Sequence, residues 1–318
     1  MKVWIARPMT ASVEARAREA FADLEIRETN AVMSEAEMLR ALTEFDVVVP
    51  TLGDRFTAEI FAKVTEPRCK LLANFGVGYN HIDVAAANAV GVQVTNTPGA
   101  VTDATADIAM TLILMSARRA GEGERLVRAG QWDGWHPTQM LGLHATGKTV
   151  GIVGMGRIGQ AIARRCHFGF GMKVHYVARS PKELDFEATR AADINALAGA
   201  VDFLVVAVPG GAETTHLINT DVLSAMKPTG HLINIARGEV VEEAALIAAL
   251  DAGEIAGAGL DVYEFEPKVP QALIDRENVT LLPHLGTATE EVRSDMGHMA
   301  LDNVAAFLAD QALPNPVS

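Results

Sequence analysis

Short apolar runs, separated by stretches with helical periodicity, recur along most of the chain. This alternation is typical of α/β proteins with parallel sheets. It occurs in two blocks with an irregular stretch between them, so we predict two sheets. The first block has predicted strands at 3–6, 46–49, 70–75 and 92–96 and a helix at 13–22; the second has strands at 149–153, 173–176, 203–206, 231–234, 257–260 and 280–282, then a helix at 289–308.

The segment between the blocks begins with a long apolar helix, predicted at 104–118 with Thr102 or Asp103 as its N-cap. Apolar positions run nearly all round this helix, so we expect it to be buried between layers. Residues 121–146 then lose any regular period. We interpret them as either an inter-domain connection or an arm that packs on another subunit.

Composition narrows the class of protein. A length of 318 residues allows about two domains, and 49% apolar with 21% charged residues argues against disorder or coiled coil. The net charge of −13 argues against a general nucleic-acid binder, which needs a basic face. Two cysteines, Cys69 and Cys166, are too few for a disulfide framework, and we predict no metal site. Without a signal-peptide core or a transmembrane run, we expect a cytoplasmic protein with no membrane partner.

The most specific local motif is a glycine-rich turn. Gly154, Gly156 and Gly159 form G-x-G-x-x-G directly after a predicted strand and before a predicted helix at 160–166. This context fits a dinucleotide site, where the first glycine permits the turn, the second lets the backbone approach a pyrophosphate, and the third allows close helix packing. The alternative is a tight strand-to-helix turn without a ligand.

The next predicted strand bears on cofactor choice. An Asp or Glu at its end would bind the ribose of NAD. Here the strand ends in Ala178-Arg179-Ser180, and the first carboxylate is Glu183. A guanidinium and a hydroxyl suit a 2′-phosphate, so we predict NADP(H) as the preferred cofactor with NAD(H) possible. The alternative is an arginine on an exposed loop.

Three polar side chains stand where later strands end: Arg237, Glu266 and His284. Ligands of open α/β sheets collect at the carboxyl ends of strands. Arginine can bind a carboxylate with two parallel hydrogen bonds. A carboxylate beside histidine stabilises the protonated imidazole and fixes its tautomer, as a general acid or base requires.

Taken together, these motifs resemble those of the D-isomer-specific 2-hydroxyacid dehydrogenases, and the resemblance runs nearly end to end. It is carried by residues 76–83, 154–159, 234–238, 261–267 and 283–287. Residues 135–142 and the missing ribose carboxylate are most similar to the NADPH-preferring glyoxylate and hydroxypyruvate reductases of that family. The departure at 79–81, Tyr-Asn-His in place of the more usual Tyr-Asp-Asn, is interpreted as a neutral surface change.

The resemblance implies an α/β fold of two Rossmann-like, doubly wound parallel-sheet domains. A flavodoxin-like substrate domain would comprise residues 1–98 and 288–318. A Rossmann domain that binds NAD(P) would comprise residues 99–287, with a dimerisation arm near 118–146. Trp135 and Met140 of this arm would reach the active site of the partner subunit, so a homodimer is implied.

The implied activity is NADPH-dependent reduction of a small 2-keto acid to the D-2-hydroxy acid. Arg237 would hold the substrate carboxylate, His284 would supply the proton, and Glu266 would be the partner of His284. The predicted substrate-binding set is Leu52, Val77, Gly78, Trp135, Met140 and Arg237. The predicted cofactor-binding set is Thr105, Gly154, Gly156, Arg157, Ile158, Gly159, Arg179, Ser180, Pro209, Thr214, Ile235, Ala236, Arg237, Asp261, His284 and Gly286.

Several alternatives remain at this point. The substrate could be a bulkier 2-keto acid such as phenylpyruvate or 2-ketogluconate, and 3-phosphoglycerate dehydrogenase is a further relative. Formate dehydrogenases share the architecture but carry glutamine where this chain has Glu266. A protein of another class, a non-enzymatic sensor of NAD(P)H, would bind the cofactor without turning it over.

Overall fold

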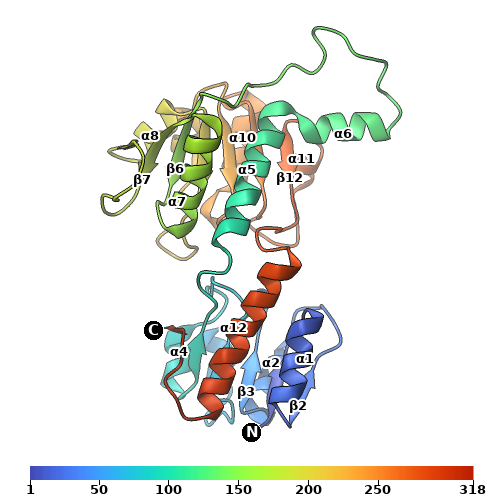
Figure 1. Ribbon diagram of the computed structural model, residues 1–318, viewed down its shortest axis with the longest axis vertical. Coiled ribbons are helices and arrows are strands. Elements are labelled where there is room, and N and C mark those ends of the chain that lie inside the picture. Colours follow the sequence, from blue (N-terminus) through green and yellow to red (C-terminus); the bar gives the residue numbers. More distant parts are fainter. Residues whose placement is uncertain (318) are drawn as a thin grey trace. The chain divides into compact units, whose positions relative to one another are not determined.

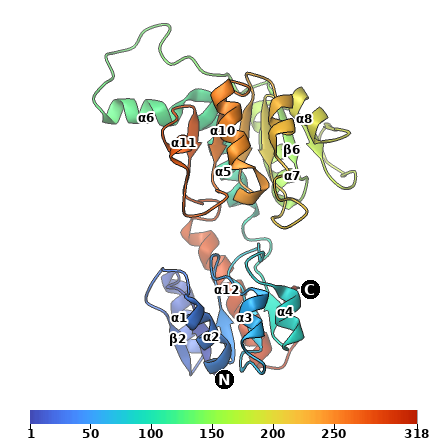
Figure 2. The same cartoon turned by 180° about the vertical axis from the view of Figure 1, so that it is seen from behind.

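The computed structural model describes residues 1–317, which divide into two compact units. The first comprises Met1–Val101 together with Ala288 onward, and the second comprises Thr102–Thr287. Each unit contains one sheet with helices on both of its faces (Figures 1 and 2). The predicted α/β fold class with two parallel-sheet domains is confirmed.

The first unit is built on a six-stranded sheet in the order β13-β5-β4-β3-β1-β2, parallel except for β13. This order, without β13, is that of flavodoxin-like folds. Helices α1 and α12 cover one face, and α2, α3 and α4 cover the other. Its elements are β1 (Val3–Ile5), α1 (Ala11–Ala20), β2 (Leu24–Ile26), α2 (Glu35–Glu44), β3 (Val47–Val49), α3 (Ala58–Ala62), β4 (Leu71–Ala73), α4 (Val84–Ala89), β5 (Gln93–Thr95), α12 (Glu290–Leu308) and β13 (Pro316–Val317).

The second unit contains a fully parallel seven-stranded sheet, in the order β12-β11-β10-β9-β6-β7-β8. The order reverses at β6, as in a Rossmann fold. Helices α5 and α7 pack on one face, and α8, α9 and α10 on the other. Its strands are β6 (Thr149–Val153), β7 (Lys173–Val177), β8 (Ala188–Arg190), β9 (Phe203–Val206), β10 (His231–Asn234), β11 (Gly257–Leu260) and β12 (Val279–Leu281).

Helices lie between most of those strands along the chain. A π-helical turn follows α7, and a 3-10 turn follows β10. Their bounds are α5 (Thr102–Arg118), α6 (Ala120–Arg128), α7 (Arg157–Arg164), the π turn η1 (Arg165–Gly169), α8 (Ile194–Ala200), α9 (Thr220–Ala225), the 3-10 turn η2 (Gly238–Val240), α10 (Glu243–Ala252) and α11 (Gln271–Ile274).

Two expectations about the segment between the sheets are wrong. Helix α5 begins at Thr102, so Thr102 and Asp103 belong to its first turn rather than preceding it. The region expected to lack any period opens with helix α6, which buries none of its residues. A helix that buries no face does not need apolar residues at helical spacing. The sequence of α6 therefore lacked the pattern by which helices are predicted.

Within residues 1–317, none of the helices combines the length and the apolar character that crossing a bilayer requires.

Candidate active site

The carboxyl ends of the seven parallel strands in the second unit carry most of the predicted site residues. Gly154 follows β6, Arg179 follows β7, and Pro209 follows β9. Arg237 and His284 follow β10 and β12, which lie on the same side of β6 as β9, whereas β7 lies on the other side. Because the strands are parallel, these ends share one edge of the sheet, which is where doubly wound folds bind ligands.

The glycine-rich turn has the geometry that a dinucleotide needs. Gly154 has a left-handed φ of +100°, and a Cβ there would lie 2.7 Å from the carbonyl oxygen of Ala207. A Cβ on Gly159 would lie 2.0 Å from the carbonyl oxygen of Gly154, so helix and turn pack too closely for a side chain. Gly156 faces open space. The turn therefore leaves room for a pyrophosphate at Gly156, next to the first residues of α7.

The predicted cofactor residues Arg157 and Ile158 are the first two residues of α7, which carries no side-chain cap at Gly156. Its first backbone N–H groups consequently point out of the helix without a capping side chain. These donors and the positive end of the helix dipole suit an anionic group. The residues present fit the diphosphate of a dinucleotide.

The end of β7 is cationic. Arg179 and Ser180 are exposed, and Lys182 Nζ lies 3.3 Å from the Ser180 hydroxyl. Among residues 1–317, Arg179 forms no ion pair. The strand carries no carboxylate at the position where a ribose would be bound through its two hydroxyls. A guanidinium with unused donors remains available for a phosphate.

The loop after β9 closes on itself through Thr214, whose hydroxyl donates to the carbonyl of Pro209 over 2.7 Å. Gly210 in this loop lies against the next predicted site segment, since a Cβ on it would come within 2.8 Å of Arg237 Cγ. Pro209 and Thr214 thus lie beside the Arg237 loop, as a shared ligand site requires.

Arg237 is placed by Asn234, a residue that sequence reasoning did not assign to the site. Asn234 accepts from the N–H of Ala236 over 3.1 Å and donates to the carbonyl of Arg237 over 3.0 Å, so it fixes the turn after β10. Burial lowers the pKa of Arg237, while Glu239 and Glu266 act to raise it. Within the described residues Arg237 forms no ion pair, and its one hydrogen bond goes to the carbonyl of Ala236. Arg237 is half-buried, and its guanidinium keeps hydrogen-bond donors for the carboxylate of a ligand.

His284 and Glu266 form a pair at the same edge. His284 Nδ1 lies 2.9 Å from Glu266 Oε2, and both side chains are about one-third exposed, at 30% and 32%. Burial acts to raise the pKa of Glu266, but the hydrogen bond and charge of His284, the N–H of Tyr263 and the charge of Arg237 together lower it. The carboxylate is therefore ionised and binds Nδ1, which leaves Nε2 of the imidazole for a ligand.

Asp261 has a role that sequence reasoning missed. Its two carboxylate oxygens accept the backbone N–H groups of Leu285 and Gly286, over 2.6 and 2.8 Å. The hydroxyl of Thr105 donates to the carbonyl of Gly286 over 3.2 Å. His284 itself has a left-handed φ of +56°, a strained conformation for a histidine. Asp261 thereby stabilises the turn that holds His284 in place.

In the first unit, Val77 and Gly78 follow β4 in a loop held by asparagine side chains. Asn96 donates to the carbonyl of Val77 over 2.9 Å, and Asn74 donates to the carbonyl of Gly78 over 3.1 Å. The backbone N–H groups of Val77 and Gly78 have no acceptor within residues 1–317. Leu52 lies in a separate turn of the same unit and is 40% exposed.

The prediction of a neutral surface change at 79–81 is wrong for His81. This residue is 9% exposed, and its Nε2 lies 3.0 Å from Asn74 Oδ1. Asn74 in turn donates to the carbonyls of Gly76 and Gly78. Through Asn74, His81 thus helps to fix the Val77–Gly78 loop. The sequence alone gave no signal of the contact between His81 and Asn74.

The segment between α6 and β6, residues 129–148, extends away from the rest of its unit (Figure 1). We call it the protruding segment. Trp135 is 81% exposed, and Met140 lies over α6, since a Cβ on Gly123 would lie 3.5 Å from Met140 Cε. No hydrogen bond or ion pair in residues 1–317 joins either side chain to the His284 pair. Within one chain, the structure does not bring these two predicted residues to the rest of the site.

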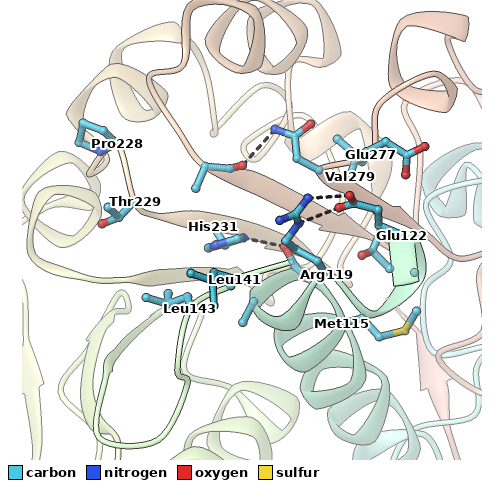
Figure 3. A pocket seen from close by; sticks show the side chains of 17 residues that line it. Met115, Arg119, Glu122, Leu141, Leu143, Pro228, Thr229, His231, Glu277 and Val279 are labelled. Carbon is cyan, nitrogen blue, oxygen red and sulfur yellow. Dashed lines mark hydrogen bonds and ion pairs between the residues drawn. The ribbon is translucent and has the colours of Figure 1, made fainter. Parts of the chain in front are cut away.

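A cavity of about 570 Å³ lies elsewhere in the second unit, and Arg237, Glu266 and His284 are not among the residues that line it. Figure 3 shows Arg119 paired with Glu122 there. The Nδ1 of His231 lies 2.7 Å from the hydroxyl of Ser116. Burial lowers the pKa of His231 to about 4, so this histidine is neutral and structural. The wall formed by residues 141–143 belongs to the protruding segment.

Comparison with known proteins agrees with this geometry. Residues 110–286 match the family described as D-isomer specific 2-hydroxyacid dehydrogenase, NAD binding domain. The glyoxylate reductase of Thermococcus onnurineus is 42% identical over 323 aligned residues, covering 100% of this chain and 96% of the relative.

Solved structures resemble the whole chain as well. A putative D-isomer specific 2-hydroxyacid dehydrogenase from Polaromonas sp. JS6 66 is 38% identical with a TM-score of 0.92, covering 100% of this chain and 99% of that one. The NADPH-dependent glyoxylate/hydroxypyruvate reductase of Sinorhizobium meliloti, solved with NADP and malonate, is 38% identical with a TM-score of 0.86, covering 100% and 96%. The chain belongs to the D-isomer-specific 2-hydroxyacid dehydrogenase family.

Proposed function

We propose that this protein reduces a small 2-keto acid, of the glyoxylate or hydroxypyruvate type, to the D-2-hydroxy acid with NADPH. The observation that carries the proposal is the His284–Glu266 pair at the strand edge that also holds Arg237 and the glycine-rich turn; within residues 1–317, Arg237 forms no ion pair. Relatives named glyoxylate reductase, at 42% identity over the full chain, support the substrate class.

Each residue has one task in the proposed reaction. Arg237 binds the substrate carboxylate with two parallel hydrogen bonds and so orients the carbonyl. His284 donates a proton from Nε2 to the carbonyl oxygen, and Glu266 stabilises the protonated imidazole through Nδ1. A bound nicotinamide cofactor supplies the hydride. The free N–H groups of Val77 and Gly78 are proposed as further donors to the carboxylate.

A panel of 2-keto acids tests this proposal. We expect kcat/KM to be highest for glyoxylate or hydroxypyruvate and lower for phenylpyruvate and 2-ketogluconate, with NADPH and NADH compared side by side. A preference for the bulky acids would replace the proposed substrate class. Binding of NADPH without oxidation by any acid in the panel would indicate a sensor instead of an enzyme.

Arg179 is the residue on which the proposed NADPH preference rests. Replacing Arg179 by alanine should raise the KM for NADPH by at least about tenfold and change the KM for NADH little, because only NADPH carries a 2′-phosphate for the guanidinium. Steady-state kinetics with both cofactors measure this. Arg18→Ala, which removes an exposed arginine from α1 in the other unit, is the control. Equal changes for both cofactors would contradict the 2′-phosphate assignment.

We further propose a homodimer formed through the protruding segment. Trp132 and Trp135 are 53% and 81% exposed, Leu141 is 69% exposed, and α6 buries no residue of its own. Large apolar side chains gathered on one extended segment indicate a protein partner. In the dimer, Trp135 and Met140 are proposed to reach the partner's substrate site.

Light scattering tests the dimer. The native chain of 33.8 kDa should have twice that mass in solution, and a Trp132→Ser, Trp135→Ser, Leu141→Ser variant should lose the second copy. Val32→Ser, which removes another exposed apolar side chain, should remain dimeric. A native monomer, or a triple variant that dimerises as tightly as the native protein, would contradict this interface.

The cytoplasm is the proposed location. Both cysteines, Cys69 and Cys166, are buried free thiols, and burial raises the pKa of each to about 12. Such thiols are inert and behave as small apolar side chains, which suits a reducing compartment.

A further inference from the structure

Two glutamates outside the predicted site, Glu243 and Glu264, hold each other through reciprocal hydrogen bonds. The N–H of Glu264 donates to Glu243 Oε1 over 2.9 Å, and the N–H of Glu243 donates to Glu264 Oε2 over 3.1 Å. Glu243 is the first residue of α10, so the Glu264 side chain also caps that helix. We name this pair the glutamate bracket. It fastens the segment that carries Glu266 to the start of α10.

The bracket places an acid where burial is costly. Glu243 is only 6% exposed, and its Oε2 has no hydrogen-bond partner within residues 1–317. Burial raises the pKa of Glu243, the N–H of Glu264 acts to lower it, and the charges of Glu264 and Glu266 raise it further. Apolar side chains usually fill such positions at lower cost. The buried acid at this position therefore points to a function for the hydrogen bond that its carboxylate accepts from the N–H of Glu264.

Glu264 is held on its other side by His216. His216 Nε2 lies 2.7 Å from Glu264 Oε1, and the N–H of His216 donates to the carbonyl of Glu239 over 2.8 Å. Both carboxylate oxygens of Glu264 are therefore occupied, one by α10 and one by the loop after β9. The backbone at Glu264 has little freedom to rotate.

From the bracket, a short chain of contacts leads to the imidazole. Tyr263, next to Glu264, donates its N–H to Glu266 Oε1 over 3.0 Å, and the other oxygen of Glu266 contacts His284. The hydroxyl of Tyr263 also donates to the carbonyl of Leu282 over 2.9 Å. The peptide unit that carries the N–H of Tyr263 directly precedes the unit that carries the N–H of Glu264, and the two share the Cα of Tyr263. A change in the backbone at Tyr263 would consequently shift the Glu266 carboxylate away from Nδ1 of His284.

We propose that the glutamate bracket positions Glu266 against His284, which makes Glu243 and Glu264 positioning residues for proton transfer. This inference rests on the proposed function, because it takes the His284–Glu266 pair as the source of the proton. The titratable groups that act on the bracket are His216 and Glu266, while Arg237 and Asp261 act on Glu266.

A matched pair of variants tests the bracket. Glu243→Met keeps the side-chain length but removes the acceptor, and Glu243→Gln keeps an acceptor for the N–H of Glu264. We expect Glu243→Met to lower kcat about 10- to 100-fold, the effect of a small displacement in a reacting group. The KM for the keto acid and the Kd for NADPH should change little, since Arg237 and the glycine-rich turn are untouched. Glu243→Gln should restore most of the lost turnover.

A double-mutant cycle separates positioning from a general loss of stability. In a Glu266→Ala background, Glu243→Met should lower kcat by less than about twofold, because the side chain that it positions is already gone. The same loss in both backgrounds, native turnover in Glu243→Met, or equal losses in the methionine and glutamine variants would overturn the proposal.

A second pair covers the case in which Glu243→Met does not fold. Glu264→Met, at a residue whose side chain is 14% exposed, removes the contacts to α10 and His216. It should lower kcat at unchanged KM, and Glu264→Gln should retain most of the activity. Native turnover in Glu264→Met would also overturn the proposal. If the native protein does not oxidise NADPH with any of the keto acids, the proposed function itself is wrong. That outcome is distinguishable from a failure of the bracket proposal, which concerns only the variants.

Discussion

Replacing His284 by alanine should lower kcat by about 10²–10⁴-fold, the usual contribution of a general acid. Among residues 1–317, the imidazole of His284 is the titratable side chain that is hydrogen-bonded to Glu266, with Nδ1 at 2.9 Å from Oε2. Without it, no side chain in this pair can donate a proton to the carbonyl oxygen. The Kd for NADPH, measured by nicotinamide fluorescence, should change far less than kcat, because the glycine-rich turn that is proposed to hold the diphosphate does not involve this side chain.

Glu266→Gln is the matched control for this prediction. Glutamine can still contact Nδ1, but it does not carry the charge that stabilises a protonated imidazole. We expect a smaller loss in kcat than for His284→Ala. If His284→Ala kept near-native turnover, the assignment of the proton donor would be wrong.

Replacing Arg237 by methionine should lower kcat/KM by at least about 10²-fold. Hydrogen bonds to charged groups contribute about 1.5–3 kcal/mol each, two are lost, and each 1.36 kcal/mol is a factor of ten. Arg237→Lys should recover only part of the loss, because an ammonium cannot form the two parallel hydrogen bonds.

A neutral substrate makes this prediction specific. With hydroxyacetone, which has no carboxylate, Arg237→Met and the native protein should be similarly slow, since the guanidinium has nothing to bind. An equal loss of activity for hydroxypyruvate and hydroxyacetone would mean that Arg237 acts on the fold or the cofactor and not on the substrate carboxylate.

The central strands of both sheets were predictable, because strands covered on both faces consist of uninterrupted apolar residues. Strands β6, β9, β10 and β11 have the predicted bounds. The strands that were missed, β2, β8 and β13, lie at sheet edges and are half-buried or exposed. An edge strand has less need of apolar residues, so its sequence resembles that of a loop.

In the site, too, some residues could be predicted from the sequence and others could not. Arg237, Glu266 and His284 could be identified because each follows a buried strand or a recognisable motif. The contacts that hold them could not: Asp261 binds the turn at 285–286, and Glu243 binds Glu264. Such polar contacts join residues more than twenty positions apart and leave no periodic trace in the sequence. The contact of His81 with Asn74 joins residues only seven positions apart, but it too follows no periodic pattern. The roles of Arg179, Val77, Gly78 and the protruding segment stay predictions.

The most direct test of the central claim follows the hydride and the stereochemistry in one experiment. The protein is incubated with hydroxypyruvate and NADPH carrying two deuterons at C4 of the nicotinamide, and the glycerate is analysed by mass spectrometry and chiral chromatography. Hydride transfer from NADPH to one face of the keto acid should give D-glycerate with one deuteron at C2. L-Glycerate, a racemic product, or glycerate without deuterium at C2 would contradict it.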